Sequence, residues 1–137
     1  MKKILVKKQE GSTLIKPILG TYDPESNPPR FSLKFMLGDK DFSFDGLDDN
    51  HKLAFANKIN TLSKLTWSDL RISGRHGLGY EKIERSALKF FLPCDIPADR
   101  NIIAFRFCGM APMLGYRSAY GTFYIIAFDS KFIAYKH

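Results

Sequence analysis

The last third of the chain carries polar side chains that suit chemistry at a phosphodiester: Arg106, Arg117, Tyr135 and His137. A guanidinium group can donate two parallel hydrogen bonds to a phosphate, and a histidine, with an ordinary pKa of about 6.5, exchanges a proton near neutral pH. Such a set can cleave RNA without a metal. One group takes the 2′-hydroxyl proton, a second protonates the leaving 5′-oxygen, and the arginine stabilises the charge that develops on phosphorus. These four residues are therefore candidate catalytic residues.

The same residues also have a structural interpretation. Arg106 can pair with Asp129 or Asp95, and His137 can belong to a frayed terminus. A buried, unpaired charge costs several kcal/mol, so an arginine planted in an apolar strand needs either a carboxylate partner or a wet face. Both interpretations stay open from the residues alone.

A second candidate surface is basic and rich in glycine, between Ser73 and Tyr80. Three glycines would let backbone amides approach a ligand, and two further side chains there carry charge or titrate. The segment matches neither GxxxxGK[ST] nor GxGxxG, so the glycines can also serve turns alone. Together with the basic residues around it, this segment supplies the candidate nucleic-acid-binding residues: Arg71, Arg75, His76, Lys82 and Arg85.

Metal and nucleophile chemistry have little support in the sequence. There are 3 histidines and no CxxC, and no GxSxG motif occurs. The aspartates between residues 39 and 49 crowd a turn and a helix start, where they would cap the helix and favour its dipole. We therefore expect no metal and no other cofactor.

The candidate catalytic residues must be positioned by strands. The runs at 101–107, 121–129 and 131–135 are apolar and aromatic, and they predict a C-terminal meander of three antiparallel strands. The segment 109–120 contains glycines and Pro112, and it is interpreted as the link between the first two. Strand alternation places Ile103, Phe105 and Phe107 on one face and Arg106 on the other. Along 121–129 both faces are fairly apolar, which predicts an interior strand.

The most regular helical pattern lies within residues 47–70. Asp48, Asp49 or Asn50 would be the N-cap, and an apolar stripe begins at Leu53 and recurs at helical spacing. Trp67 is expected to anchor the core rather than to stack on a ligand. The segment 80–91 is interpreted as a second helix or turn, although 88–92 could equally be strand.

The N-terminal part is predicted to be β-rich. Residues 3–8 favour an edge strand that 12–20 continue, 21–30 are interpreted as a loop, and 31–37 with 41–47 are predicted to form a hairpin. The alternation puts Phe31, Leu33, Phe35 and Leu37 on one face. The predicted fold is a single α+β domain over residues 1–137, with a mainly antiparallel sheet packed against one long helix.

Charge favours a polyanionic partner. The net charge is +7, and the excess lies in the second half: residues 1–70 hold 11 Lys+Arg against 9 Asp+Glu, whereas 71–137 hold 10 against 5. Solubility alone is the alternative explanation. No apolar run is long enough to span a bilayer and the N-terminal apolar stretch is short for a signal peptide, so we expect no membrane partner and a cytoplasmic location.

The segments FRFCG, LGYR, FYIIAFD and FIAYKH, within residues 103–137, resemble the C-terminal part of the RelE/ParE-like toxin superfamily. That resemblance implies a small basic toxin that cleaves mRNA, with RNA or the ribosome as its target and an antitoxin protein as its partner. It also implies that Arg106 or Arg117 stabilises the phosphate and that Tyr135 and His137 handle protons. The alternative is a non-catalytic phage or mobile-element protein that binds nucleic acid or a host protein through its basic C-terminal half.

Overall fold

The computed structural model describes residues 23–74 and 77–136. The strands expected at 3–8 and 12–20 and the candidate residues Arg75, His76 and His137 lie outside the described residues. In the described part, an α+β fold is built on a five-stranded sheet, with strand order β2-β6-β5-β4-β3. Its strands are β2 (Arg30–Ser32), β3 (Tyr80–Ile83), β4 (Ile102–Cys108), β5 (Ala111–Arg117) and β6 (Thr122–Phe128).

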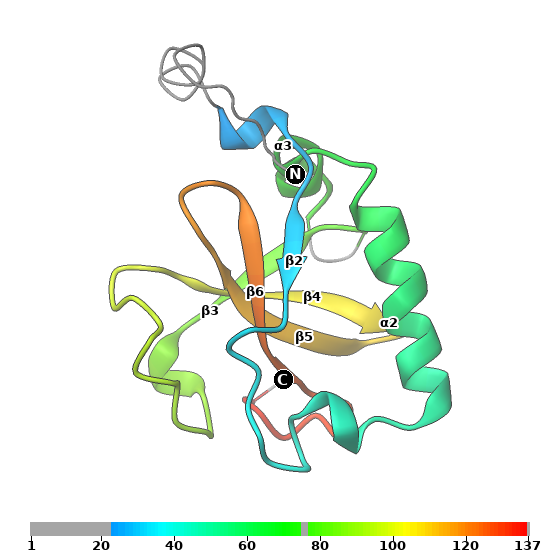
Figure 1. Ribbon diagram of the computed structural model, residues 1–137, viewed down its shortest axis with the longest axis vertical. Coiled ribbons are helices and arrows are strands. Elements are labelled where there is room, and N and C mark those ends of the chain that lie inside the picture. Colours follow the sequence, from blue (N-terminus) through cyan, green and yellow to red (C-terminus); the bar gives the residue numbers. More distant parts are fainter. Residues whose placement is uncertain (1–22, 75–76, 137) are drawn as a thin grey trace.

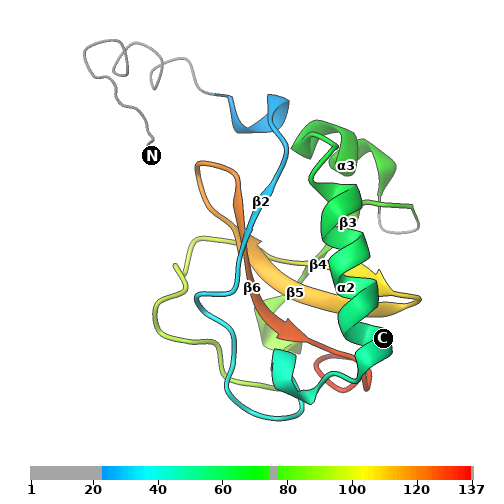
Figure 2. The same ribbon diagram turned by 45° about the vertical axis from the view of Figure 1, so that its right-hand side comes forward.

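Two helices and three single 3-10 turns complete the elements of the described residues. The helices are α2 (Asp49–Leu62) and α3 (Trp67–Ser73), and the turns are η1 (Pro24–Ser26), η2 (Phe44–Gly46) and η3 (Arg85–Ala87). Both helices lie on the same side of the sheet, and irregular segments cover the other side (Figures 1 and 2). None of the helices that the structure describes is long and apolar enough to cross a bilayer.

Both faces of the sheet are buried. On the helix side, Ile103, Phe105 and Phe107 of β4 pack with Trp67 and Leu62 in one hydrophobic cluster. On the opposite side, a second cluster places Ile102 and Ala104 of β4 against side chains from segments 35–42, 88–96 and 134–135. We call these the helix face and the loop face. The predicted division of β4 side chains between two faces is confirmed.

The long helix begins where the sequence places it. Asp48 is the N-cap, and its Oδ1 accepts a hydrogen bond from the backbone N–H of His51 at 2.8 Å. The apolar stripe differs from the prediction, because Leu53 is 62% exposed whereas Phe55, Ile59 and Leu62 face the sheet. The chain then forms a second helix, α3, whose Thr66–Asp69 capping box was not anticipated. The described part of the chain therefore has two helices, where the sequence predicts one long helix.

The N-terminal hairpin prediction was wrong. β2 pairs in parallel with β6, with Arg30 opposite Thr122, whereas the other three pairings of the described strands are antiparallel, so the sheet is mixed. After β2 the chain leaves the ladder and touches β6 at single hydrogen bonds, such as Leu37 N–H to the Ile126 carbonyl at 2.8 Å. Phe31 packs on the helix face and Phe35 on the loop face, so these residues do not share a face.

The C-terminal meander exists, and two of its three predicted strands are found as β4 and β6, but the third strand is β5 rather than residues 131–135. The expected link contains β5, and it pairs antiparallel with β4 and β6. The expected third strand at 131–135 is a turn instead. Asp129 is fully buried and its two carboxylate oxygens accept the N–H groups of Ile133 (2.8 Å) and Ala134 (3.1 Å), while Phe132 takes a left-handed φ of 58°. These bonds turn the chain away from the ladder.

The segment 80–91 also differs from its interpretation as a helix. Tyr80–Ile83 is strand β3, paired antiparallel with β4 so that Glu81 lies opposite Ala104. The 3-10 turn η3 follows it, which agrees with the turn alternative. Glu81 and Lys82 consequently project from opposite faces of an edge strand.

Candidate functional site

Arg106 lies on the loop face of the sheet. Its neighbours Phe105 and Phe107 belong to the helix-face cluster, so the strand alternation directs Arg106 to the other side. Glu81 lies on the same side, on the adjacent strand β3, since it is paired with Ala104 two residues away. The side chain of Arg106 is half-buried, as is that of Glu81.

Tyr135 joins these two residues from the C-terminal segment. Its hydroxyl donates a long hydrogen bond of 3.5 Å to Glu81 Oε1, and Arg106 is close enough to influence its ionisation. Burial, followed by the negative charges of Glu81 and Asp129, raises the pKa of Tyr135 to about 12, although Arg106 opposes the shift. The phenol therefore keeps its proton at neutral pH. We call Glu81, Arg106 and Tyr135 the Arg106 cluster.

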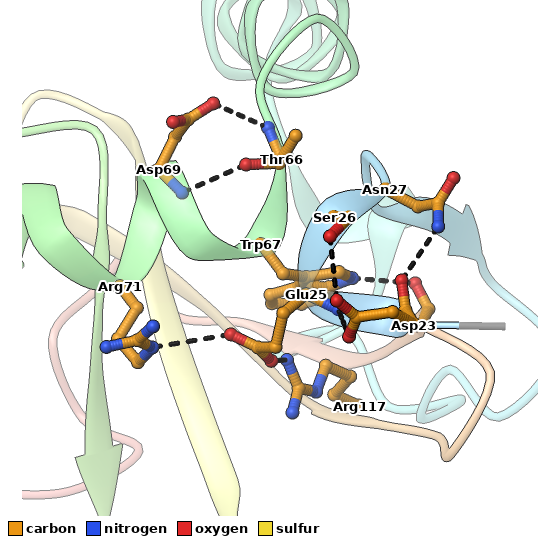
Figure 3. A network of polar contacts seen from close by, with 10 residues as sticks. Asp23, Glu25, Ser26, Asn27, Thr66, Trp67, Asp69, Arg71 and Arg117 are labelled. Carbon is orange, nitrogen blue, oxygen red and sulfur yellow. Dashed lines mark hydrogen bonds and ion pairs between the residues drawn. The ribbon is translucent and has the colours of Figure 1, made fainter. Parts of the chain in front are cut away.

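Arg117 lies on the helix face, at the end of β5. Its guanidinium carbon stands 5.0 Å from the centre of the Trp67 ring, and its Nη1 donates to Glu25 Oε2. Arg71, in the last turn of α3, donates from Nε to the other oxygen of Glu25 at 3.3 Å. Figure 3 shows the Glu25 side chain between the two arginines. We call Glu25, Trp67, Arg71 and Arg117 the Arg117 cluster.

The two guanidinium groups determine the ionisation of Glu25. Burial raises the pKa of this carboxyl, but hydrogen bonds and charge attraction from Arg117 and then Arg71 outweigh burial and hold the pKa below its ordinary value of 4.5. Glu25 is therefore a carboxylate at neutral pH. One acidic side chain holds two of the basic residues singled out in the sequence.

Trp67 provides the floor of the Arg117 cluster. It is fully buried, and its Nε1–H donates to the Gly121 carbonyl at 2.9 Å. Its ring contacts Tyr80, Phe105 and Phe123 at centroid distances of 5.8 to 6.4 Å. These contacts agree with the predicted role of Trp67 as a core anchor. The Arg117 guanidinium over the face of the ring gives Trp67 a second role, as the partner of a cation.

A small cavity lies beside Arg117, with a volume of about 180 Å³. It is walled by residues from the start of β3, the end of the loop before β4, and the end of β5: Tyr80, Asp99, Arg100, Asn101, Ile103 and Arg117. Cavities that hold drug-sized ligands measure roughly 300 to 1,000 Å³. This one has room for a small polar group.

The other predicted binding residues have different settings. Arg85 uses its Nη2 to donate to the carbonyls of Pro97 (2.5 Å) and Arg100 (2.6 Å), so it holds the loop that enters β4. Lys82 is exposed on the edge strand β3 and lines a surface groove with Arg85. Glu84, which lies between them in the sequence, is exposed and lines the same groove.

The sequence-predicted catalytic residues thus divide between two faces. Arg106 and Tyr135 come together on the loop face, whereas Arg117 joins Arg71 on the helix face, so the two candidate arginines do not meet on one phosphate. Sequence reasoning missed Glu81 and Glu25. Glu81 would have emerged had residues 80–83 been recognised as a strand next to β4, but no local pattern points from Glu25 to Arg117, 92 positions away.

Within residues 23–74 and 77–136, no three histidine, cysteine, aspartate or glutamate side chains are grouped in a way that could hold a metal ion. No protein-family model, curated protein or solved structure matches the chain.

Proposed function

We propose that the protein is a metal-independent endoribonuclease of toxin type that acts at the Arg106 cluster. The observation that carries the proposal is the juxtaposition of a carboxylate, a guanidinium and a protonated phenol at the C-terminal end of the fold. The expected partners are RNA or the ribosome, and an antitoxin protein that neutralises the activity in its host.

The reaction that these groups suit is an intramolecular phosphoryl transfer. The Glu81 carboxylate takes the proton of a ribose 2′-hydroxyl, whose oxygen attacks phosphorus, and the bond to the 5′-oxygen breaks. Tyr135 or His137 gives a proton to that leaving oxygen, and the products are a 2′,3′-cyclic phosphate and a 5′-hydroxyl. Arg106 stabilises the negative charge that develops on the phosphate oxygens. The high pKa of Tyr135 suits it to the role of acid and not of base.

The test is RNA cleavage by purified variants, with and without ribosomes and in the presence of a chelator. Loss of a single charge-stabilising donor typically lowers kcat by about 100- to 1,000-fold, and we expect a loss of that order for Arg106→Ala. Glu81→Gln and His137→Ala should also be impaired, and Tyr135→Phe should be impaired at every pH below about 12, because the wild-type phenol keeps its proton there. Lys64→Ala, at an exposed position after α2, is the control and should cleave at the wild-type rate.

Two results would contradict the proposal: cleavage by Arg106→Ala at the wild-type rate, or cleavage that the chelator abolishes. Growth arrest on expression gives an independent readout, which Arg106→Ala should relieve. The second candidate function is nucleic-acid binding without cleavage. It is favoured by the separation of Arg106 and Arg117 on opposite faces, since cations spread over a surface suit backbone binding better than a single reacting centre.

A further inference from the structure

The cavity beside Arg117 is separate from the Arg106 cluster, which lies on the opposite face of the sheet. Two arginines, Arg100 and Arg117, line it together with Asn101 and Tyr80. Among the described residues that line it, Asp99 is the one carboxylate, so these residues carry a formal charge of +1. The polar groups present are mainly hydrogen-bond donors, which is what an oxyanion requires.

The donors are held in place by the fold. Arg85 bonds the carbonyls of Pro97 and Arg100, and the Arg100 N–H donates to the Pro97 carbonyl at 3.2 Å, so the loop that carries Arg100 is fixed. Arg117 rests on the ring of Trp67. Burial raises the pKa of Tyr80 above its ordinary value of 10, although Arg117 opposes this, so its hydroxyl keeps its proton. Donors that are already ordered lose little entropy when an anion binds.

Glu25 shows that this corner of the molecule accepts an anion. Its two oxygens are bound by Arg117 and Arg71, one each. A guanidinium has five N–H donors, and Glu25 accounts for one nitrogen of Arg117, so the rest of the group is available to the cavity wall. Glu25 is then both a positioning group for Arg117 and a competitor for its charge.

We propose that this cavity binds a phosphate group, held by Arg117 and Arg100 with Tyr80 and Asn101 as further donors. The size of the cavity suits one phosphate and excludes a whole nucleotide, so a larger ligand would leave its sugar and base outside. This site does not depend on the proposed cleavage reaction. If RNA is the substrate, the cavity binds a phosphate of the RNA strand that is distant from the bond being cleaved.

The chain contains a natural reporter, because Trp67 is its only tryptophan and Arg117 lies over its ring. We would follow tryptophan emission during titration with sodium phosphate, with sodium chloride at matched ionic strength as the reference. The wild-type protein should give a saturable change that chloride does not produce. Arg100→Gln should bind phosphate at least tenfold more weakly. The tryptophan signal remains a valid reporter in this variant, because no contact between Arg100 and Trp67 is found in the part of the chain that the structure describes. Arg117→Gln is measured by calorimetry, since it alters the reporter itself.

Glu25→Gln separates a ligand site from a purely structural ion-pair network. If the cavity binds phosphate, removing the competing negative charge should tighten binding severalfold, whereas a structural network predicts a less stable protein and no gain in affinity. Lys64→Gln removes a charge elsewhere and should leave affinity unchanged. The proposal is overturned by the absence of a phosphate-specific response in the wild type, by full affinity in Arg100→Gln, or by an equal loss in Lys64→Gln.

The source of the phosphate is decided by a second ligand. A fluorescein-labelled 2′-O-methyl RNA oligonucleotide cannot be cleaved, so its binding is independent of the reaction. The site would be assigned to a nucleic-acid backbone if inorganic phosphate displaces this RNA strand and if the variants that bind phosphate weakly also bind the strand weakly. Binding of phosphate without displacement of the strand would assign it to a free phosphate or a phosphate monoester. Circular dichroism melting of each variant distinguishes loss of the site from loss of the fold.

Discussion

Three arginines of this chain perform three different tasks, although the sequence presents them as one class. Arg85 bonds two backbone carbonyls, Arg117 stacks on an indole and pairs with a carboxylate, and Arg106 lies beside a tyrosine and a glutamate. A guanidinium group can do each of these because it is planar, permanently charged and has five donors. At the residue scale, the task is therefore determined by the neighbours that the fold supplies.

Asp129 illustrates this at a buried position. We predict that Asp129→Ala lowers the free energy of unfolding by about 2 to 4 kcal/mol, because two backbone N–H groups lose a charged acceptor in the interior. The measurement is urea denaturation followed by tryptophan fluorescence. Cleavage of RNA should fall as well, since these bonds position the segment that carries Tyr135.

Asp41→Ala is the matched control for that prediction. Asp41 also accepts a hydrogen bond, from Lys131 Nζ at 2.8 Å, but both partners are exposed, and exposed ion pairs contribute little to stability. We expect Asp41→Ala to unfold close to the wild-type midpoint. Equal destabilisation by the two variants would show that the C-terminal turn does not depend on the Asp129 carboxylate.

At the scale of elements, β5 shows how breakers can be accommodated within a strand. Gly109, with a φ of 57°, makes the turn before it, and Pro112 lies at the irregularity between Arg106 and Cys108. Gly115 lies at a second irregularity, between Leu114 and Gly115 in the pairing with β6. Glycine and proline are tolerated in sheets at such bulges. A sequence pattern that treats them as strand-breaking residues therefore does not predict β5, whose pairing with β4 and β6 accommodates them.

We predict that Gly115→Ala destabilises the protein by about 1 to 3 kcal/mol, the usual cost of overpacking a core. A Cβ at this position would overlap the backbone carbonyl of Tyr124 and come within 2.9 Å of the Phe123 ring. Gly38→Ala is the control, because a Cβ there meets nothing within 4 Å. Urea denaturation of both variants is the measurement. A Gly115→Ala midpoint as high as that of Gly38→Ala would mean that the β5–β6 pairing can adjust.

The elements that were predictable are those with local signals. The N-cap at Asp48, the anchor at Trp67 and the two faces of β4 follow from capping chemistry and alternation, and all three are found. The errors arise where tertiary pairing decides. A parallel partner for β2 lies about 90 residues away in sequence, and the bulge in β6 sends Ala127 and Phe128 to the faces opposite to those that simple alternation gives.

The candidate site was predictable to the same extent. Arg106 and Tyr135 were found from their residue types and prove to be neighbours. Glu81 was missed because residues 80–83 were interpreted as helix or turn, and the grouping of Arg117 with Arg106 failed because no local pattern shows which face the end of β5 presents. The pairing of strands that are far apart in the sequence decides which residues join each cluster.

At the scale of the whole molecule, the sheet acts as a partition between two polar clusters. Its interior strands bury apolar side chains on both faces, so the Arg106 cluster and the Arg117 cluster are separated by a packed layer. The two candidate arginines, Arg106 and Arg117, consequently lie on opposite faces of the sheet. A long, flexible nucleic-acid strand can reach both clusters, whereas a single phosphate cannot.

This partition makes a quantitative prediction for the double variant Arg106→Gln/Arg117→Gln. Residues without shared partners act additively, so the losses of binding free energy for the uncleavable oligonucleotide should sum to within about 0.5 kcal/mol. Each substitution should also lower the slope of log affinity against log salt by about 0.7, the value for one phosphate contact on a single strand. Fluorescence anisotropy at several salt concentrations gives both quantities. The pair Arg71→Gln/Arg117→Gln is the positive control, because Glu25 couples those residues. Strong coupling between Arg106 and Arg117 would instead mean that one phosphate contacts both, and two separate sites would have to be abandoned.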